Sequence, residues 1–195
     1  MIHDFSRFLC ILFFKLVCRV EVKGRDNIPG GGGFILASNH VSYLDTMAVG
    51  SACPRRLNNM AMHDLFSCRL SSWFLSALGV FPVKRNSADI SALKEAMVRV
   101  ERGGGLLLFP EGTRSQDGKL SEKSEAGIGF LAAKLNVPVI PVFVKGTEKA
   151  LPKGAKFIVP AKVAVCFGKQ IHIERRMPYQ DIAQLILDHI RHLSC

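Results

Sequence analysis

The N-terminus of this sequence lacks an apolar stretch as long as a transmembrane helix. Its uninterrupted apolar part, Phe8–Phe14, is far shorter than the ~20 residues that cross a bilayer. No small-residue cleavage site follows, so a signal peptide is not expected. The basic residues Arg7, Lys15 and Arg19 flank or interrupt the stretch. Residues 1–18 therefore fit a helix that lies in the headgroup region of a membrane, with an ordinary helix that covers the core as the alternative.

Tryptophan and tyrosine are scarce, with one Trp and two Tyr in 195 residues. Proteins that bind nucleic acids interleave aromatic side chains with a basic stripe. Here the phenylalanines lie mostly inside apolar runs, so no nucleic-acid partner is expected. The chain is nonetheless basic, because 26 Lys and Arg face 16 Asp and Glu, a formal net charge of +10. By charge alone this excess favours an anionic partner, such as a phospholipid surface, a phosphorylated metabolite, an acidic carrier or nucleic acid, and the distribution of the aromatic residues argues against the last of these.

The six cysteines form no Cys-x-x-Cys pair and no Cys/His set with zinc spacing. His189 and His192 are three residues apart, but they lie where a solvated helix end is predicted. We therefore expect no metal and no resident cofactor, and we expect reduced thiols. The motifs Gly-x-Ser-x-Gly and Gly-Lys-Ser/Thr are also missing. Nothing in the sequence therefore indicates a covalent acyl-enzyme or a phosphate-binding P-loop.

Short apolar segments alternate with helical patterns along the rest of the chain. The predicted strands are Arg19–Lys23, Phe34–Ser38, Asn59–Met62, Val80–Val83, Leu106–Phe109, Val139–Val144 and Lys162–Phe167. The predicted helices are Leu44–Ser51, Asp64–Leu78, Ala88–Arg102, Ser124–Leu135 and Tyr179–Leu193. Such alternation is typical of an α/β fold whose mostly parallel central sheet is flanked by helices. With no linker visible, we predict one domain over residues 19–195, preceded by the N-terminal helix of residues 1–18.

Three polar clusters each follow a predicted strand. They are His40 with Asp45, Lys84 with Arg85, and Glu111–Ser115. Ligands of open α/β sheets bind outside the carboxyl ends of the strands. If the strands run parallel, the three clusters should meet at one edge of the sheet despite their separation in sequence.

His40 and Asp45 are candidates for proton transfer, because an imidazole is the usual side chain that moves a proton near neutral pH. In one continuous helix, residues five apart point in directions about 140° apart. The pair therefore requires that His40 precede a helix and that Asp45 lie in its first turn. Ser42 is the predicted N-cap of this helix. Asp45 could then accept from one imidazole nitrogen and leave the other to take a proton.

The other two clusters suit an anionic substrate. Arg85 is a candidate phosphate ligand, because a guanidinium matches phosphate geometry with paired hydrogen bonds. In the third cluster Gly112 lets the backbone approach a ligand, Thr113 offers a hydroxyl and Arg114 offers a fixed charge. Glu111 beside an anion site needs a cation to hold or a hydroxyl to orient. A histidine base beside such a site suits direct attack of a deprotonated hydroxyl on an acyl carbon.

Four sequence blocks occur in order between Asn39 and Val142. They are Asn-His-x-x-x-x-Asp at Asn39–Asp45, an apolar strand ending in arginine at Gly79–Arg85, Phe-Pro-Glu-Gly-Thr-Arg-Ser at Phe109–Ser115, and a proline-containing apolar strand at Val137–Val142. In these blocks the chain resembles the glycerolipid acyltransferase family, particularly the 1-acylglycerol-3-phosphate acyltransferases.

The resemblance implies that a fatty acyl group moves from acyl-CoA or acyl-carrier protein to the sn-2 hydroxyl of 1-acylglycerol-3-phosphate (lysophosphatidic acid). The product is phosphatidic acid, in phospholipid biosynthesis. The resemblance also implies that His40 is the general base and Asp45 its orienting partner. The residues it implies for binding the phosphate-bearing acceptor are Arg85, Glu111, Gly112, Thr113 and Arg114.

The resemblance further implies an enzyme on the cytoplasmic face of the cell inner membrane, peripheral or monotopic, which agrees with the basic and apolar N-terminus. The same chemistry on another acceptor stays open, such as a lyso-ornithine lipid, another lysophospholipid or glycerol phosphate. A non-catalytic module that binds membranes is the alternative from another class. Such a module would be expected to lose His40 or Asp45, and both residues are present.

Overall fold

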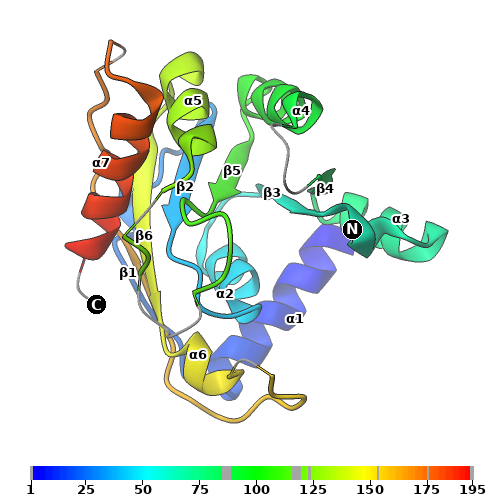
Figure 1. The fold of residues 1–195 in the computed structure, drawn as a ribbon. Helices are drawn as coiled ribbons and strands as arrows, with labels where there is room; N and C mark the ends of the chain where they lie inside the picture. Colours follow the sequence, from blue (N-terminus) through cyan, green and yellow to red (C-terminus); the bar gives the residue numbers. More distant parts are fainter. Residues whose placement is uncertain are drawn as a thin grey trace.

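The computed structural model describes residues 2–84, 89–115, 120–122, 124–152, 154–174 and 176–193. Within them a seven-stranded sheet runs through the middle of the molecule, and helices lie on both of its faces (Figure 1). The strands are β1 (Glu21–Lys23), β2 (Phe34–Ser38), β3 (Leu57–Met62), β4 (Val80–Val83), β5 (Gly105–Leu108), β6 (Val139–Lys145) and β7 (Ala164–Phe167). The prediction of an α/β domain with a mostly parallel central sheet is confirmed.

The strand order across the sheet is β1-β7-β6-β2-β5-β3-β4. Strands β2 to β6 all run parallel, whereas β7 pairs antiparallel with β6 and β1 pairs parallel with β7. In the register of the central strands, Ala37 of β2 lies opposite Leu108 of β5 and Pro141 of β6. The segments that follow β2, β5 and β6 therefore leave the sheet at the same edge.

Strand β2 is buried along its whole length because helices cover both faces of the sheet. Phe34 and Leu36 belong to a core cluster with side chains of α1 (Ile2–Leu16) and α2 (Leu44–Ala52). Ile35 and Ala37 point to the other face, where the cluster contains side chains of α4 (Ile90–Glu101), α5 (Ala126–Leu135) and α7 (Tyr179–Arg191). Burial on both faces explains the continuous apolar run of this strand.

The structure breaks the helix that the sequence predicts over residues 64–78. A 3-10 helix, η2 (His63–Phe66), comes first, and helix α3 (Arg69–Ala77) follows it. Between them Cys68 is extended, and its Sγ accepts the amide of Ser71 as the N-cap of α3. Two further short helices, η1 (Arg25–Asn27) and α6 (Thr147–Ala150), are too short for a periodic pattern to reveal them.

The cysteines differ in state. Cys10, Cys18, Cys53 and Cys68 are free, as expected. Cys166 is disulfide-bonded, so the expectation of reduced thiols is wrong at this position. The physical reason is that counting and spacing do not show which thiols the fold brings together.

Helix α1 packs on the domain through Phe14, which is fully buried beside α2 and the sheet. No helix in the described part of the chain is long and apolar enough to cross a membrane. The division of the chain between residues 18 and 19 stays a prediction.

Candidate active site

His40 and Asp45 lie together just beyond the carboxyl end of β2, where the sequence predicts them. Nδ1 of His40 is 2.9 Å from Oδ2 of Asp45. Because a carboxylate only accepts hydrogen bonds, Nδ1 is the donor in this contact, and Nε2 is the acceptor nitrogen of the neutral imidazole. The Asp45 side chain is fully buried, whereas 17% of the His40 side chain is exposed. The imidazole is therefore the member of the pair that can reach a substrate.

Asp45 accepts three further hydrogen bonds. Its Oδ2 accepts the backbone amides of Val41 at 2.7 Å and Ser42 at 2.8 Å. Its Oδ1 accepts the hydroxyl of Thr147 at 2.5 Å. As the sequence requires, His40 precedes α2 and Asp45 lies in its first turn. The carboxylate thus fixes both the loop and the imidazole.

The prediction that Ser42 caps α2 is wrong. Tyr43 precedes the helix and makes no side-chain cap bond. The hydroxyl of Ser42 donates to the carbonyl of Leu151 at 3.1 Å and accepts the amide of Leu44 over a long 3.4 Å. Asp45 accepts the amides of Val41 and Ser42, which precede the helix, and its own amide donates to the backbone carbonyl of Ser42 at 3.2 Å.

Asn39 ties the start of this loop to the neighbouring strand. Its Nδ2 donates to the carbonyl of Val144 on β6 at 2.8 Å, and the amide of Val144 donates to its Oδ1 at 2.7 Å. This reciprocal pair extends the contact between β2 and β6 beyond the backbone ladder. The sequence pattern assigns no role to Asn39, since its partner lies 105 residues away.

Phe109 packs flat against the imidazole of His40. The two ring centroids are 3.9 Å apart and the ring planes differ by 19°. Contact along one face restricts how far the imidazole can rotate. Phe109 is absent from the residues predicted for the site, although its place in the third block directly after a predicted strand is a signal that could have found it.

Glu111 binds backbone amides through both of its carboxylate oxygens. Oε1 accepts the amide of His40 at 2.8 Å, and Oε2 accepts the amide of Ser121 at 2.9 Å. The amide of Ser115 in turn donates to the carbonyl of His40 at 2.8 Å. Burial raises the pKa of the Glu111 carboxyl above its usual value, although these amides act in the opposite direction. In this structure Glu111 holds the backbone of His40, and its binding of an acceptor stays a prediction.

The rest of the third block lies beside the loop of His40. Gly112 has a φ of +65°, a conformation that favours glycine. The guanidinium of Arg114 lies 3.5 Å from the centre of the Tyr43 ring, and Tyr43 belongs to the loop between His40 and Asp45. The side chain of Thr113 is exposed. The structure therefore brings the first and third clusters together, as predicted.

The second cluster lies farther along the same edge of the sheet. Arg85 lies outside the described residues, so its predicted role is not tested. Lys84 follows β4, and its amide donates to Oδ2 of Asp89, the N-cap of α4, at 2.9 Å. Since β3 separates β4 from β5, the ends of these strands are roughly 10 Å apart.

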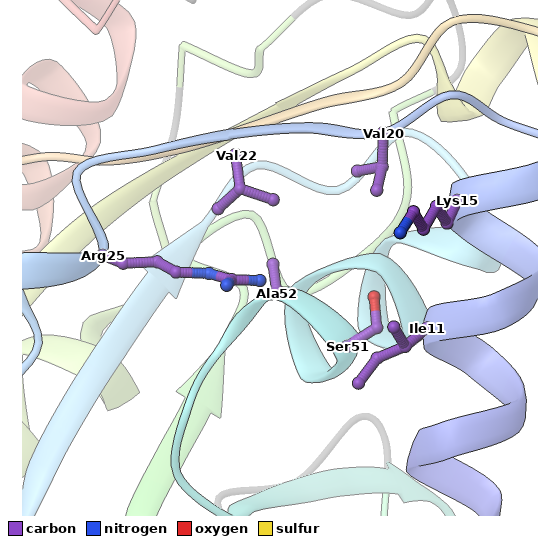
Figure 2. A pocket seen from close by; sticks show the side chains of 7 residues that line it. All are labelled: Ile11, Lys15, Val20, Val22, Arg25, Ser51 and Ala52. Carbon is purple, nitrogen blue, oxygen red and sulfur yellow. The ribbon is translucent and has the colours of Figure 1, made fainter.

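A separate pocket of about 310 Å³ lies between α1, the segment of β1 and the end of α2 (Figure 2). Its walls are mostly apolar, and the side chains of Lys15 and Arg25 point into it. None of the residues predicted for the active site lines this pocket. Among the described residues, no group of three or more His, Cys, Asp or Glu side chains could hold a metal ion.

The acyltransferase family model matches residues 19–145, which include every residue predicted for the site. The chain belongs to the acyltransferase family. This acyltransferase-family chain is 33% identical over 144 residues to the chloroplastic 1-acyl-sn-glycerol-3-phosphate acyltransferase BAT2 of Brassica napus, a match that covers 72% of the chain and 41% of that relative. It is 26% identical over 155 residues to the 1-acyl-sn-glycerol-3-phosphate acyltransferase of Bacillus subtilis (strain 168), covering 78% of the chain and 74% of that relative. The chain thus spans less than half the length of the plant relative.

The fold of this family member is also shared with a solved structure. It superimposes on the crystal structure of the 1-acyl-sn-glycerophosphate (LPA) acyltransferase PlsC from Thermotoga maritima with a TM-score of 0.75. The match covers 100% of the present chain and 80% of that chain at 24% sequence identity. The likeness shows a common fold, which agrees with the family resemblance of the four sequence blocks.

Replacing Glu111 with glutamine should lower the free energy of unfolding by about 1–3 kcal/mol near neutral pH. One end of the side-chain amide would have to present its own hydrogens to a backbone amide of His40 or Ser121. Urea unfolding measures the difference. The control is Glu125→Gln at an exposed position of the same segment, where a change within about 0.5 kcal/mol is expected. Equal effects of the two variants would contradict the assigned contacts.

The same variant should change how stability depends on pH. Because the folded-state pKa of Glu111 is raised, its contribution to stability is complete below the usual pKa of 4.5 and is lost as the pH rises through the folded-state pKa. Glutamine does not titrate. The advantage of the wild-type protein over Glu111→Gln should therefore shrink as the pH rises above 4.5. Unfolding of both proteins across this range measures the trend, and an advantage that grows with pH would contradict it.

Proposed function

We propose that this protein transfers a fatty acyl group from an acyl-thioester to the sn-2 hydroxyl of 1-acylglycerol-3-phosphate, giving phosphatidic acid. The observation that carries the proposal is the imidazole of His40, which is bonded at 2.9 Å through Nδ1 to the buried carboxylate of Asp45 and whose side chain is itself partly exposed. The family match and the names of the relatives from Brassica napus and Bacillus subtilis support this choice of acceptor.

In the proposed reaction Nε2 of His40 takes the proton of the sn-2 hydroxyl as the hydroxyl oxygen attacks the thioester carbonyl carbon. The new C–O bond forms a tetrahedral intermediate, and the C–S bond then breaks. The imidazolium returns its proton to the departing sulfur, which leaves as the thiol of coenzyme A or of acyl-carrier protein. Asp45 stabilises the positive charge of the imidazolium in between, and no covalent acyl-enzyme forms.

The phosphate of the acceptor would be held by the basic groups of the second and third blocks. Arg114 lies against the loop of His40, beside the exposed Thr113. Arg85 is the partner that the sequence predicts from the second block. A guanidinium donates paired hydrogen bonds to phosphate oxygens, which would orient the sn-2 hydroxyl toward the imidazole.

The test is an assay of thiol release by the purified protein, with acyl-CoA or acyl-carrier protein as donor. The acceptors are lysophosphatidic acid, a lyso-ornithine lipid, another lysophospholipid and glycerol 3-phosphate. We expect the highest kcat/KM with lysophosphatidic acid, and phosphatidic acid as the product by mass spectrometry. Turnover confined to another acceptor would correct the substrate, and no thiol release with any acceptor would contradict acyl transfer.

We also propose that α1 binds the surface of a phospholipid membrane, as a peripheral or monotopic anchor on the cytoplasmic face of the inner membrane. Phe5, Phe8, Leu9, Leu12 and Leu16 are all exposed, and their spacing places them along one side of the helix. Beside this apolar side, Lys15 and Arg25 point into the pocket shown in Figure 2, where they could meet lipid phosphates. An apolar face bordered by cations is typical of helices that lie in a membrane interface.

The double variant Phe5→Ser with Phe8→Ser should lower the fraction of protein bound to anionic vesicles by roughly tenfold or more, because two exposed rings would no longer enter the interface. Sedimentation with phosphatidylglycerol vesicles measures the bound fraction. The control is Ile90→Ser, which removes an exposed apolar side chain from α4 instead. Undiminished binding of the folded double variant would contradict the membrane role of α1.

A further inference from the structure

We propose that Thr147 is a positioning residue for acyl transfer, acting on His40 through Asp45. The inference rests on the proposed function of the His40–Asp45 pair. Thr147 Oγ1 donates to Asp45 Oδ1 at 2.5 Å, across 102 residues of sequence. Both side chains are completely buried. Neither the four sequence blocks nor the spacing of polar residues points to this contact.

Thr147 and Asp45 reach the site because each follows a strand that ends at the same edge of the sheet. Strand β6 lies beside β2 and runs parallel to it, so the chain leaves both strands at one edge of the sheet. Gly146 follows β6 with a φ of +93°, and a Cβ at this position would lie 2.0 Å from the carbonyl oxygen of Lys162. Only glycine allows this close turn. Thr147 is the next residue, and it begins α6 facing the buried carboxylate.

The two oxygens of Asp45 have different tasks. Oδ2 accepts from the imidazole of His40 and from two backbone amides. Oδ1 accepts a hydrogen bond from the hydroxyl of Thr147. Among the described residues, Thr147 is its one hydrogen-bond donor. Rotation about the Cβ–Cγ bond moves both oxygens together, so a donor at Oδ1 opposes the same rotation that would take Oδ2 out of line with Nδ1 of His40. The hydroxyl of Thr147 is this donor, and the side chain of Asp45 is fully buried, so solvent does not replace it.

Helix α6 is itself held against the loop of His40 at its far end. The hydroxyl of Ser42 donates to the carbonyl of Leu151, the residue that follows α6, at 3.1 Å. The loop is thus joined to α6 at both of the helix's ends, once through Thr147 and once through Leu151. This second contact does not involve Asp45, so it should survive a change at Thr147 and keep the loop folded.

The test compares Thr147→Val, which removes only the hydroxyl, with Thr147→Ser, which keeps it. Acyl transfer to lysophosphatidic acid is measured over a range of acceptor concentrations. Thr147→Val should lower kcat by roughly 10- to 100-fold, the effect of losing one hydrogen bond to a charged group, with KM unchanged within about twofold. Thr147→Ser should stay within about threefold of the wild-type kcat. The matched control is Thr46→Val, a neighbour of Asp45 on α2, which should leave kcat unchanged.

A second measurement, which does not depend on turnover, shows which ring nitrogen of His40 carries the hydrogen. In the wild-type protein, ¹⁵N spectra of His40 should show the hydrogen on Nδ1, and in Thr147→Val a mixture of Nδ1 and Nε2 forms. Wild-type kcat in a folded Thr147→Val variant, equal losses in the Ser and Val variants, or a change in KM alone would overturn the inference. If the wild-type protein transfers no acyl group, the proposed function fails, while the imidazole spectra still decide whether Thr147 positions Asp45.

Discussion

Replacing His40 with alanine should lower kcat for acyl transfer by about 10²- to 10⁴-fold, the usual contribution of a positioned general base. Without the imidazole, no group in the described loop takes the proton of the attacking hydroxyl while facing solvent. The acceptor-binding groups remain, so the KM for lysophosphatidic acid should change by less than about threefold. Thiol release at saturating acceptor measures the loss.

The His40→Ala variant should still fold, because Asp45 keeps three of its four hydrogen-bond donors. The amides of Val41 and Ser42 and the hydroxyl of Thr147 continue to satisfy the buried carboxylate. We therefore expect a far-UV circular dichroism spectrum like that of the wild-type protein and a small decrease in Tm, which also reflects the lost stacking on Phe109. Undiminished acyl transfer by such a folded variant would contradict the role of His40 as the base.

The sequence sufficed to predict the parts of the site that local geometry dictates. Residues five apart cannot face each other in one helix, and this alone places His40 before α2 and Asp45 in its first turn. Continuous apolar runs predict strands buried on both faces, and parallel strands bring His40 and Glu111 to one edge. The structure shows the result as the bond between the His40 amide and Oε1 of Glu111 at 2.8 Å.

Contacts that depend on the order of strands were beyond sequence reasoning. Asn39 meets Val144, and Asp45 meets Thr147, because β6 lies directly beside β2. Neither the length of the intervening chain nor its periodicity states which strands are neighbours. The partner of Glu111 could not be predicted either, because Ser121 lies in an irregular segment that has no periodic pattern. The cap predicted at Ser42 fails for a related reason, since propensity does not show that the fold brings the Ser42 hydroxyl to the carbonyl of Leu151, 109 residues away.

Replacing Asp45 with asparagine should remove the negative charge of the side chain and keep its hydrogen bonds, so that the contributions of charge and geometry can be measured apart. The asparagine Oδ1 can accept from His40, Val41 and Ser42, where Oδ2 of the carboxylate now accepts. Its Nδ2 would face Thr147, whose hydroxyl can turn and accept instead of donating. Every buried polar group thus keeps a partner, and we expect a folded protein whose free energy of unfolding is lower by about 1 kcal/mol.

The Asp45→Asn variant should nonetheless lose roughly 10²-fold in kcat, because a neutral amide no longer stabilises the imidazolium that forms when His40 takes the proton. The loss should appear in kcat and leave KM for the acceptor within about twofold, since Asp45 is fully buried and away from substrate. Measurement of both constants beside urea unfolding decides between charge and structure. A stable variant with wild-type kcat would show that Asp45 only shapes the loop. A variant with normal kcat and a raised KM would place Asp45 in acceptor binding instead.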